Sequence, residues 1–138
     1  MISATITLET QFYDLDPMAV VWHGNYARFL EQARSALFQQ IGYNYMEMAE
    51  TGLAWPIVDM RIKYVASLRL LQRFTVTATL AEYENRIRID YILRDEAGKV
   101  LTKASTTQVA VTIATGEMQF VSPPQLIEKV QQCLSQQG

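Results

Sequence analysis

The sequence predicts a single α+β domain in which an antiparallel sheet wraps around one long helix. A strand-like alternation opens the chain, a strongly apolar helical pattern covers residues 25–41, and several strand-like runs follow. A sheet with one apolar face needs a covering layer, and this helix is apolar enough to provide it. The 138 residues suffice for one ordinary domain, and no linker, repeat or low-complexity segment divides residues 1–138.

The first 50 residues predict a strand, an irregular connection and the long helix. Apolar and polar residues alternate over residues 2–12, as in a half-buried strand, and turn formers occupy residues 13–24. From Asn25, the expected N-cap, the period becomes helical, and Gly42 stands where a helix commonly ends. The apolar face of this helix comprises Tyr26, Phe29, Leu30, Ala33, Leu37 and Ile41. A short second helical piece is expected over residues 43–50.

The rest of the chain predicts a meander of strands and a short C-terminal helix. Alternating patterns mark strands at residues 53–65, 74–81, 86–94 and 99–114, with a short one at 117–121. Gly98 completes a hairpin turn that starts at Asp95, because glycine tolerates the positive φ required there. Ser122, two prolines and Gln125 predict a capping box with proline at the first helical position. The helix that follows carries Leu126, Ile127, Val130 and Leu134.

Composition narrows the class of protein. Apolar residues make up 49% of the chain and the formal net charge is −2, which argues against nucleic-acid or anionic-membrane partners. The one cysteine, Cys133, excludes an intrachain disulfide and fits a reducing compartment. The chain start has no secretory pattern, and no apolar run approaches the roughly 20 residues of a membrane helix. We therefore expect a cytoplasmic protein without membrane insertion.

Candidate chemistry gathers just before the long helix. Asp14 and Asp16 lie two residues apart there, and unpaired N–H groups at a helix start favour an oxygen that carries negative charge. Asp16 can attack a carbonyl or deprotonate water there, although such a pair also occurs as plain turn residues. His23 is the only imidazole, so a histidine-based metal site is excluded and we expect no metal. Its backbone N–H matters more than its ring for binding an oxyanion.

Other charged residues have simpler interpretations. Glu31 and Arg34 are one turn apart on the helix and predict a partly buried ion pair or an interface contact. Arg86, Arg88 and Arg94 share one strand face, which is usually solvated but can also meet a phosphorylated substrate.

The segment that holds these residues resembles the signature of a known family. It reads FYDLDPMAVVWHGNYARFLEQAR, and it is similar to hotdog-fold acyl-CoA thioesterases of the 4-hydroxybenzoyl-CoA thioesterase family, including the Tol-Pal-associated thioesterases. The signature matches at Tyr13, Asp14, Asp16, Val21, His23, Tyr26, Glu31 and Arg34. The order of elements resembles the family over nearly the whole chain, whereas the motif covers its first quarter.

The resemblance implies a hotdog fold, with five or six strands wrapped around the 25–41 helix. It also implies a homodimer, often assembled into a homotetramer, with active sites at the subunit interface. By position, Asp16 would be the catalytic nucleophile or general base, and the backbone N–H at His23 would bind the thioester oxygen. The substrate would be an acyl-CoA, an aroyl-CoA or an acyl-carrier-protein thioester, with no separate cofactor because coenzyme A is part of the substrate. Substrate contacts are expected at Tyr26, Arg69, Asn85 and Arg86.

Two departures from the family pattern keep other functions open. Ala19 stands where the family usually has glycine, and Ser67-Leu68-Arg69 replaces its usual turn after the second strand. A non-catalytic acyl-thioester binding subunit is therefore an alternative. A dehydratase that uses His23 and Glu31 is another, although the proline-rich loop of such enzymes is missing.

Overall fold

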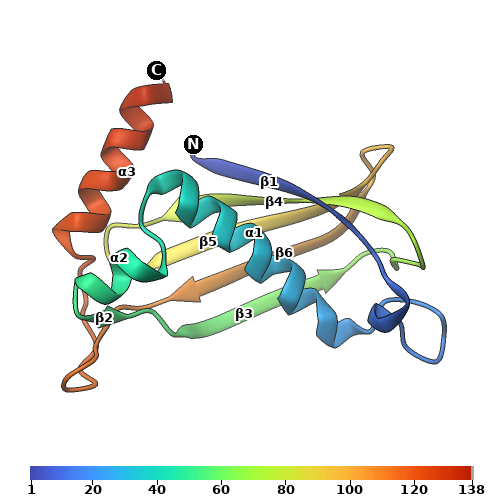
Figure 1. The fold of residues 1–138 in the computed structure, drawn as a ribbon, viewed down its shortest axis with the longest axis horizontal. Coiled ribbons are helices and arrows are strands. Elements are labelled where there is room, and N and C mark those ends of the chain that lie inside the picture. The colour runs from blue at the N-terminus through green and yellow to red at the C-terminus, as the bar shows by residue number, and fades with distance from the viewer. Residues whose placement is uncertain (138) are drawn as a thin grey trace.

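A computed structural model describes residues 1–137, in which five strands curve around one long helix (Figure 1). The sheet comprises β1 (Ser3–Glu9), β3 (Ile57–Tyr64), β4 (Arg73–Glu82), β5 (Ile87–Asp95) and β6 (Val100–Gln108). The helices are α1 (Tyr26–Ile41), α2 (Tyr45–Glu50) and α3 (Pro124–Gln137). Two 3-10 turns, η1 (Phe12–Asp14) and η2 (His23–Asn25), lie between β1 and α1, and a small ladder pairs β2 (Leu53–Ala54) with β7 (Val111–Thr112). The predicted α+β class is confirmed, with five strands in the main sheet.

The strand order differs from the predicted meander. The sheet runs β1-β4-β5-β6-β3 and every neighbouring pair is antiparallel. Only β4, β5 and β6 follow one another directly, whereas β3 pairs with β6 at the far edge. The chain then returns across the sheet from β3 to β4, which pairs with β1. The predicted strand at 117–121 is wrong, because that segment makes one isolated bridge between Met118 and Val111.

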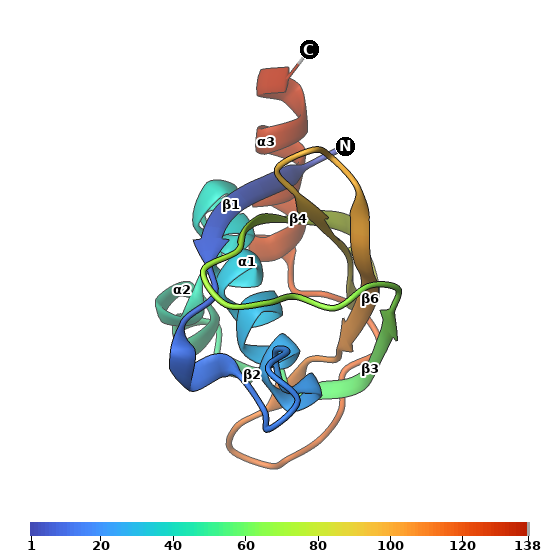
Figure 2. The ribbon, with the colours of Figure 1, turned by 90° about the vertical axis from the view of Figure 1, so that its right-hand side faces the viewer.

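The core lies between α1 and the concave face of the sheet. All six residues of the predicted apolar face of α1 are buried, and Leu30, Ala33 and Leu37 are fully so. The sheet encloses α1 from one side (Figure 2), and α1 comes closest to β1 and β4. The Phe29 and Phe74 rings meet with centroids 5.1 Å apart. Burial of this continuous apolar layer is the main term that holds sheet and helix together.

Both predicted N-caps need correction. Asn25 stands at the N-cap position, but its side chain donates to the Asp14 carbonyl at 2.9 Å and caps nothing. Ser122 is buried and its hydroxyl donates to the Tyr83 carbonyl, so it is no cap for α3, which begins at Pro124. In both cases a long-range acceptor takes the side chain that the local pattern assigned to the helix. Gly42 ends α1 as expected, with φ of 83° and its N–H bonded to Phe38.

Within residues 1–137, no helix is both long and apolar enough to cross a membrane.

Candidate active site

The loop between η1 and η2 folds back on itself and presents Asp16 at its start. Leu15 and Val21 form an antiparallel bridge, and the Asp16 N–H donates to the Val20 carbonyl at 2.8 Å. The Asp16 Oδ1 accepts from the Met18 N–H at 2.8 Å, as in an Asx turn. One carboxylate oxygen is thereby fixed, and the side chain is half-buried rather than free in solvent.

Asp14 has a different setting from Asp16. It is 5% exposed, and its Oδ2 accepts from the Gln11 N–H at 2.8 Å. Its carbonyl accepts from the Trp22 N–H and from the Asn25 side chain, both at 2.9 Å. Asp14 is thus buried within the loop, which leaves the half-buried Asp16 as the carboxylate that water or a ligand can reach.

Backbone donors lie at the first turn of η2, one turn before α1 begins. The first N–H groups of such a turn have no acceptor inside it, and the structure shows none outside it for the His23 N–H within residues 1–137. The His23 carbonyl accepts from the Tyr64 hydroxyl at 2.9 Å, and the Val21 N–H donates to the Leu68 carbonyl at 2.8 Å. These bonds anchor η2 to the end of β3 and to the loop after it.

Asp16, His23 and Tyr26 line one pocket of about 240 Å³, together with Tyr64 and the segment 65–67. Burial raises the pKa of the Tyr26 phenol, and the neighbouring Tyr64 adds to this effect. The nearby Leu68 backbone and Thr102 side chain act on this pKa in the opposite direction and are the weaker influence. Tyr26 is therefore a neutral group in the wall of the pocket at physiological pH.

A carboxylate beside unpaired backbone donors is the arrangement needed to act on a carbonyl carbon. The carboxylate can activate water or attack, while the N–H groups can bind the oxygen that gains negative charge. Within residues 1–137, no group of three or more His, Cys, Asp or Glu side chains is arranged to hold a metal ion. The Asp16 carboxylate can serve as a base or as a nucleophile at this pocket.

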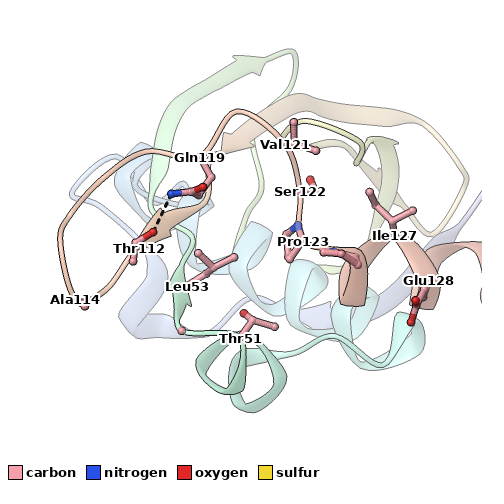
Figure 3. A pocket seen from close by; sticks show the side chains of 12 residues that line it. Thr51, Leu53, Thr112, Ala114, Gln119, Val121, Ser122, Pro123, Ile127 and Glu128 are labelled. Carbon is pink, nitrogen blue, oxygen red and sulfur yellow. Dashed lines mark hydrogen bonds between the residues drawn. The ribbon is translucent and has the colours of Figure 1, made fainter.

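A larger cavity lies elsewhere, between the β2–β7 ladder and the start of α3 (Figure 3). It measures about 830 Å³, and apolar side chains such as Leu53, Val121 and Ile127 form much of its wall. Gln119 donates to the Thr112 hydroxyl at 2.8 Å across one side. Glu128 is its only ionisable lining residue. We place the candidate chemistry in the smaller pocket, because it combines a half-buried carboxylate with unpaired backbone donors.

The other predicted substrate contacts are not all near Asp16. Arg69 directly follows Leu68, whose carbonyl bonds to Val21, so its backbone lies on the loop beside the pocket. Asn85 and Arg86 lie in the turn between β4 and β5, at the opposite end of the sheet. That turn is close to α3, since the Glu84 carbonyl accepts from the Ser122 N–H at 2.9 Å. Arg86 is paired with Glu82 at 3.1 Å.

Tyr64 is a pocket residue that the sequence interpretation missed. It was expected simply as an apolar-face member of a strand, yet its hydroxyl reaches the His23 carbonyl and its ring meets Tyr26 at 4.9 Å. The one local signal was a tyrosine at the end of an otherwise aliphatic strand face. Its partner lies 41 residues away in the sequence.

Comparisons with known proteins show which family and which fold this chain is similar to. A family model described as "Thioesterase-like superfamily" matches residues 10–132. A Bacillus subtilis (strain 168) protein named "Putative acyl-CoA thioesterase YneP" is 28% identical over 105 residues, which cover 75% of this chain and 76% of that protein. The Arabidopsis thaliana acyl-acyl carrier protein thioesterase ATL3 is 30% identical over 76 residues, covering 55% of this chain and 40% of that one.

A solved structure shares the fold over the whole length of this chain. The DHNA-CoA thioesterase from Staphylococcus aureus superposes with a TM-score of 0.84 and 24% identity, covering 100% of this chain and 97% of that chain.

Proposed function

Because the chain belongs to the thioesterase-like superfamily, whose model matches residues 10–132, we propose that it hydrolyses acyl thioesters at the Asp16 pocket. The resemblance to hotdog thioesterases that the sequence suggested is confirmed at the level of the family and the fold. The observation that carries the proposal is the half-buried Asp16 carboxylate in the same pocket as the start of η2. The proposed substrates are acyl- or aroyl-CoA or acyl-carrier-protein thioesters, since thioesterases of these kinds are among its relatives and structural neighbours.

In the proposed reaction the thioester carbonyl oxygen binds at the His23 N–H. Asp16 takes a proton from water as the water oxygen adds to the carbonyl carbon, and the negative charge moves to the carbonyl oxygen. The tetrahedral intermediate then collapses and the carbon–sulfur bond breaks. The sulfur takes the proton that Asp16 holds and leaves as a free thiol, which returns Asp16 to its carboxylate form. A direct attack by Asp16 would form an acyl anhydride that water hydrolyses to the same acid and thiol.

Ala19 belongs to the loop that holds Asp16 and bonds to it. It adopts φ of 62°, the left-handed conformation that glycine takes easily, and its N–H donates to the Asp16 carbonyl at 3.0 Å. Ala19 is therefore compatible with the bonds that hold Asp16 at the pocket, which supports the catalytic proposal.

The remaining parts of the proposal concern assembly and location. We propose a homodimer or homotetramer, because the β3 edge leaves apolar side chains exposed. No cofactor is required, since coenzyme A or the carrier arm enters with the substrate. A cytoplasmic location fits the single cysteine of the chain.

Replacing Asp16 with asparagine tests the proposal. Asp16→Asn removes the base or nucleophile while keeping the shape, so kcat should fall by about 10²–10⁴-fold. Thiol release from a panel of CoA and carrier-protein thioesters is the measurement, with Asp90→Asn on the exposed sheet face as the matched control. Thermal stabilisation by the substrate should persist in Asp16→Asn.

Two results would remove the mechanism. One is near wild-type turnover by Asp16→Asn. The other is a wild-type protein that CoA thioesters stabilise but that releases no thiol from any of them, which would indicate a binding subunit. A change in enoyl absorbance without thiol release would indicate a dehydratase instead.

A further inference from the structure

The turn that precedes α1 contains a peptide group that can adopt two orientations. The turn runs from Trp22 to Asn25, and the Asn25 N–H donates to the Trp22 carbonyl at 2.9 Å. The His23 carbonyl accepts from the Tyr26 N–H, and Gly24 is not among the residues with positive φ. The turn is therefore of type I, in which the N–H groups of His23 and Gly24 point the same way, towards the chain before the helix.

Glycine at the third position of such a turn makes a second form accessible. A type II turn keeps the closing bond, but the peptide between its two central residues is turned over and its third residue has positive φ, which glycine adopts readily. Gly24 occupies this third position. Packing requires a glycine there, since a Cβ would lie 2.4 Å from the Trp22 ring. The local sequence therefore allows both orientations of the His23–Gly24 peptide.

The two orientations present opposite groups to the pocket. In the observed one, the Gly24 N–H lies on the same side as the His23 N–H, and neither has an acceptor within residues 1–137. After a flip, the His23 carbonyl oxygen would take the place of the Gly24 N–H. A carbonyl oxygen there repels a substrate oxygen that gains negative charge, whereas an N–H stabilises it. The flipped turn would therefore be a poor oxyanion site.

Tyr64 holds the observed orientation from outside the turn. Its hydroxyl donates to the His23 carbonyl at 2.9 Å, and the two residues are 41 positions apart in the sequence. The Tyr64 ring meets the Tyr26 ring edge-on, with centroids 4.9 Å apart. Tyr64 is also the last residue of β3 and pairs with Thr102 on β6. The hydroxyl is thus supplied by the sheet, and a flip of the peptide would break its bond.

We propose that Tyr64 is a positioning residue of the active site, whose hydroxyl keeps the His23–Gly24 peptide in the orientation that presents its N–H to the thioester oxygen. The same bond polarises the peptide, because a carbonyl that accepts a hydrogen bond makes the N–H of that peptide a better donor. The kinetic consequence rests on the proposed hydrolytic function, whereas the orientation of the peptide can be observed without any reaction.

Tyr64→Phe removes the hydroxyl and keeps the ring, so it tests this role directly. Thiol release should show a kcat about tenfold lower and a KM within about twofold of the wild type, because the oxygen gains its charge only in the transition state.

Tyr43→Phe is the matched control. The Tyr43 hydroxyl is also used in the fold, since it accepts from the Trp55 Nε1 at 3.2 Å, but Tyr43 does not line the Asp16 pocket. This variant should lower the thermal midpoint and leave kcat unchanged.

A further pair of substitutions separates a peptide flip from a general loss of rigidity. Trp22→Ala combined with Gly24→Ala makes room for a side chain at residue 24 and makes positive φ unfavourable there. In this alanine background the type II form is disfavoured even without the hydroxyl, so Tyr64→Phe should lower kcat by less than about threefold. A crystal structure of Tyr64→Phe in the otherwise wild-type chain should show the His23 carbonyl turned over, and it carries this comparison if the alanine background does not fold.

The outcomes that would overturn this role differ from those that would overturn hydrolysis. An unchanged kcat in Tyr64→Phe, a higher KM instead of a lower kcat, an equal loss in the alanine background, or a His23 carbonyl that keeps its orientation would remove the positioning role and leave hydrolysis in place. A wild type that releases no thiol would remove the hydrolytic function. The crystal structure of Tyr64→Phe then decides alone, because a flipped His23 carbonyl supports the inference and an unflipped one overturns it.

Discussion

At the scale of single residues, the two aspartates before α1 differ in what surrounds each carboxylate. Asp14 is buried, and its side chain and carbonyl both bind groups of the loop. Asp16 is half-buried, and the structure shows one bond to its side chain, from the Met18 N–H. Each carboxylate accepts one hydrogen bond from the loop, so exposure separates them: Asp16 lines the pocket and can accept a proton from water there, whereas Asp14 is buried.

Ala19 tests how much strain this loop tolerates. A non-glycine residue in the left-handed region costs about 1–2 kcal/mol, and glycine loses about 0.5–1 kcal/mol through its extra freedom when unfolded. Ala19→Gly should therefore raise the free energy of unfolding by up to about 1 kcal/mol. Chemical denaturation gives the value.

Ala27→Gly, in the helical conformation of α1, is the matched control. It should lower the free energy of unfolding by about 1 kcal/mol, because glycine is a poor helix former. If Ala19→Gly destabilises the protein as much as Ala27→Gly does, the left-handed conformation of residue 19 carries no strain.

At the scale of elements, η2 decides where the free backbone donors lie. The sequence predicted a long helix from residue 25 with the His23 N–H as the donor, and the structure places the 3-10 turn η2 at residues 23–25, before α1. Gly24 makes this turn compact, because a Cβ at that position would lie 2.4 Å from the Trp22 ring. His23 therefore lines the same pocket as Asp16 and Tyr64, one turn before α1 begins.

The buried Tyr91 on β5 should make the protein less stable at alkaline pH. Burial raises the pKa of the Tyr91 phenol above its ordinary value of 10.0, and its bond to Thr106 only partly opposes this. Because the folded pKa is the higher one, the stabilisation is fully present below about pH 10 and is lost as the pH rises through the folded pKa. The free energy of unfolding should then fall by up to about 1.4 kcal/mol per pH unit from this group.

Denaturant titrations between about pH 8 and 11 measure this slope. Tyr91→Phe should be less stable at pH 8, because Thr106 loses its partner, but its free energy of unfolding should fall less steeply above pH 10. Tyr13→Phe, at a side chain that is 74% exposed, is the control and should keep the wild-type slope. Equal slopes in all three proteins would show that Tyr91 does not carry the effect.

At the scale of the whole molecule, α1 covers the β1–β4 edge of the concave face of the sheet and leaves the β3 edge more open. α1 lies nearest to β1 and β4, so the apolar residues of β3 at the other edge receive less cover. The proposed pairing of two copies would extend the sheet across this edge and bring the Asp16 pocket, at the end of β3, to the boundary between subunits.

A charge on this edge should prevent association. For a wild-type dimer, the thermal midpoint should rise with protein concentration. Met60→Lys places a cation among the apolar side chains of β3, so the thermal midpoint of this variant should not depend on concentration. Ile113→Lys introduces the same charge at another exposed apolar residue, outside β3, and should keep the dependence. Differential scanning calorimetry over a range of protein concentrations provides the comparison. A Met60→Lys protein that still shows the full dependence would place the interface elsewhere.

The sequence by itself determined the parts of this protein that depend on near neighbours. The apolar face of α1, its end at Gly42 and the alternation in β4 and β5 were all predicted, because helical and strand periods are written in residues a few positions apart. Asp16, His23 and Tyr26 were grouped for the same reason, since the loop that brings them together is formed by consecutive residues.

Only the tertiary structure decided the features that join distant segments. It placed β3 beside β6, directed the Asn25 and Ser122 side chains to carbonyls rather than to helix ends, and brought the Tyr64 hydroxyl to the His23 carbonyl. It also placed Asn85 and Arg86 at the end of the sheet opposite to Asp16. Each of these depends on which surfaces meet when the sheet closes around α1, and the energy of that packing is shared by residues far apart in the sequence.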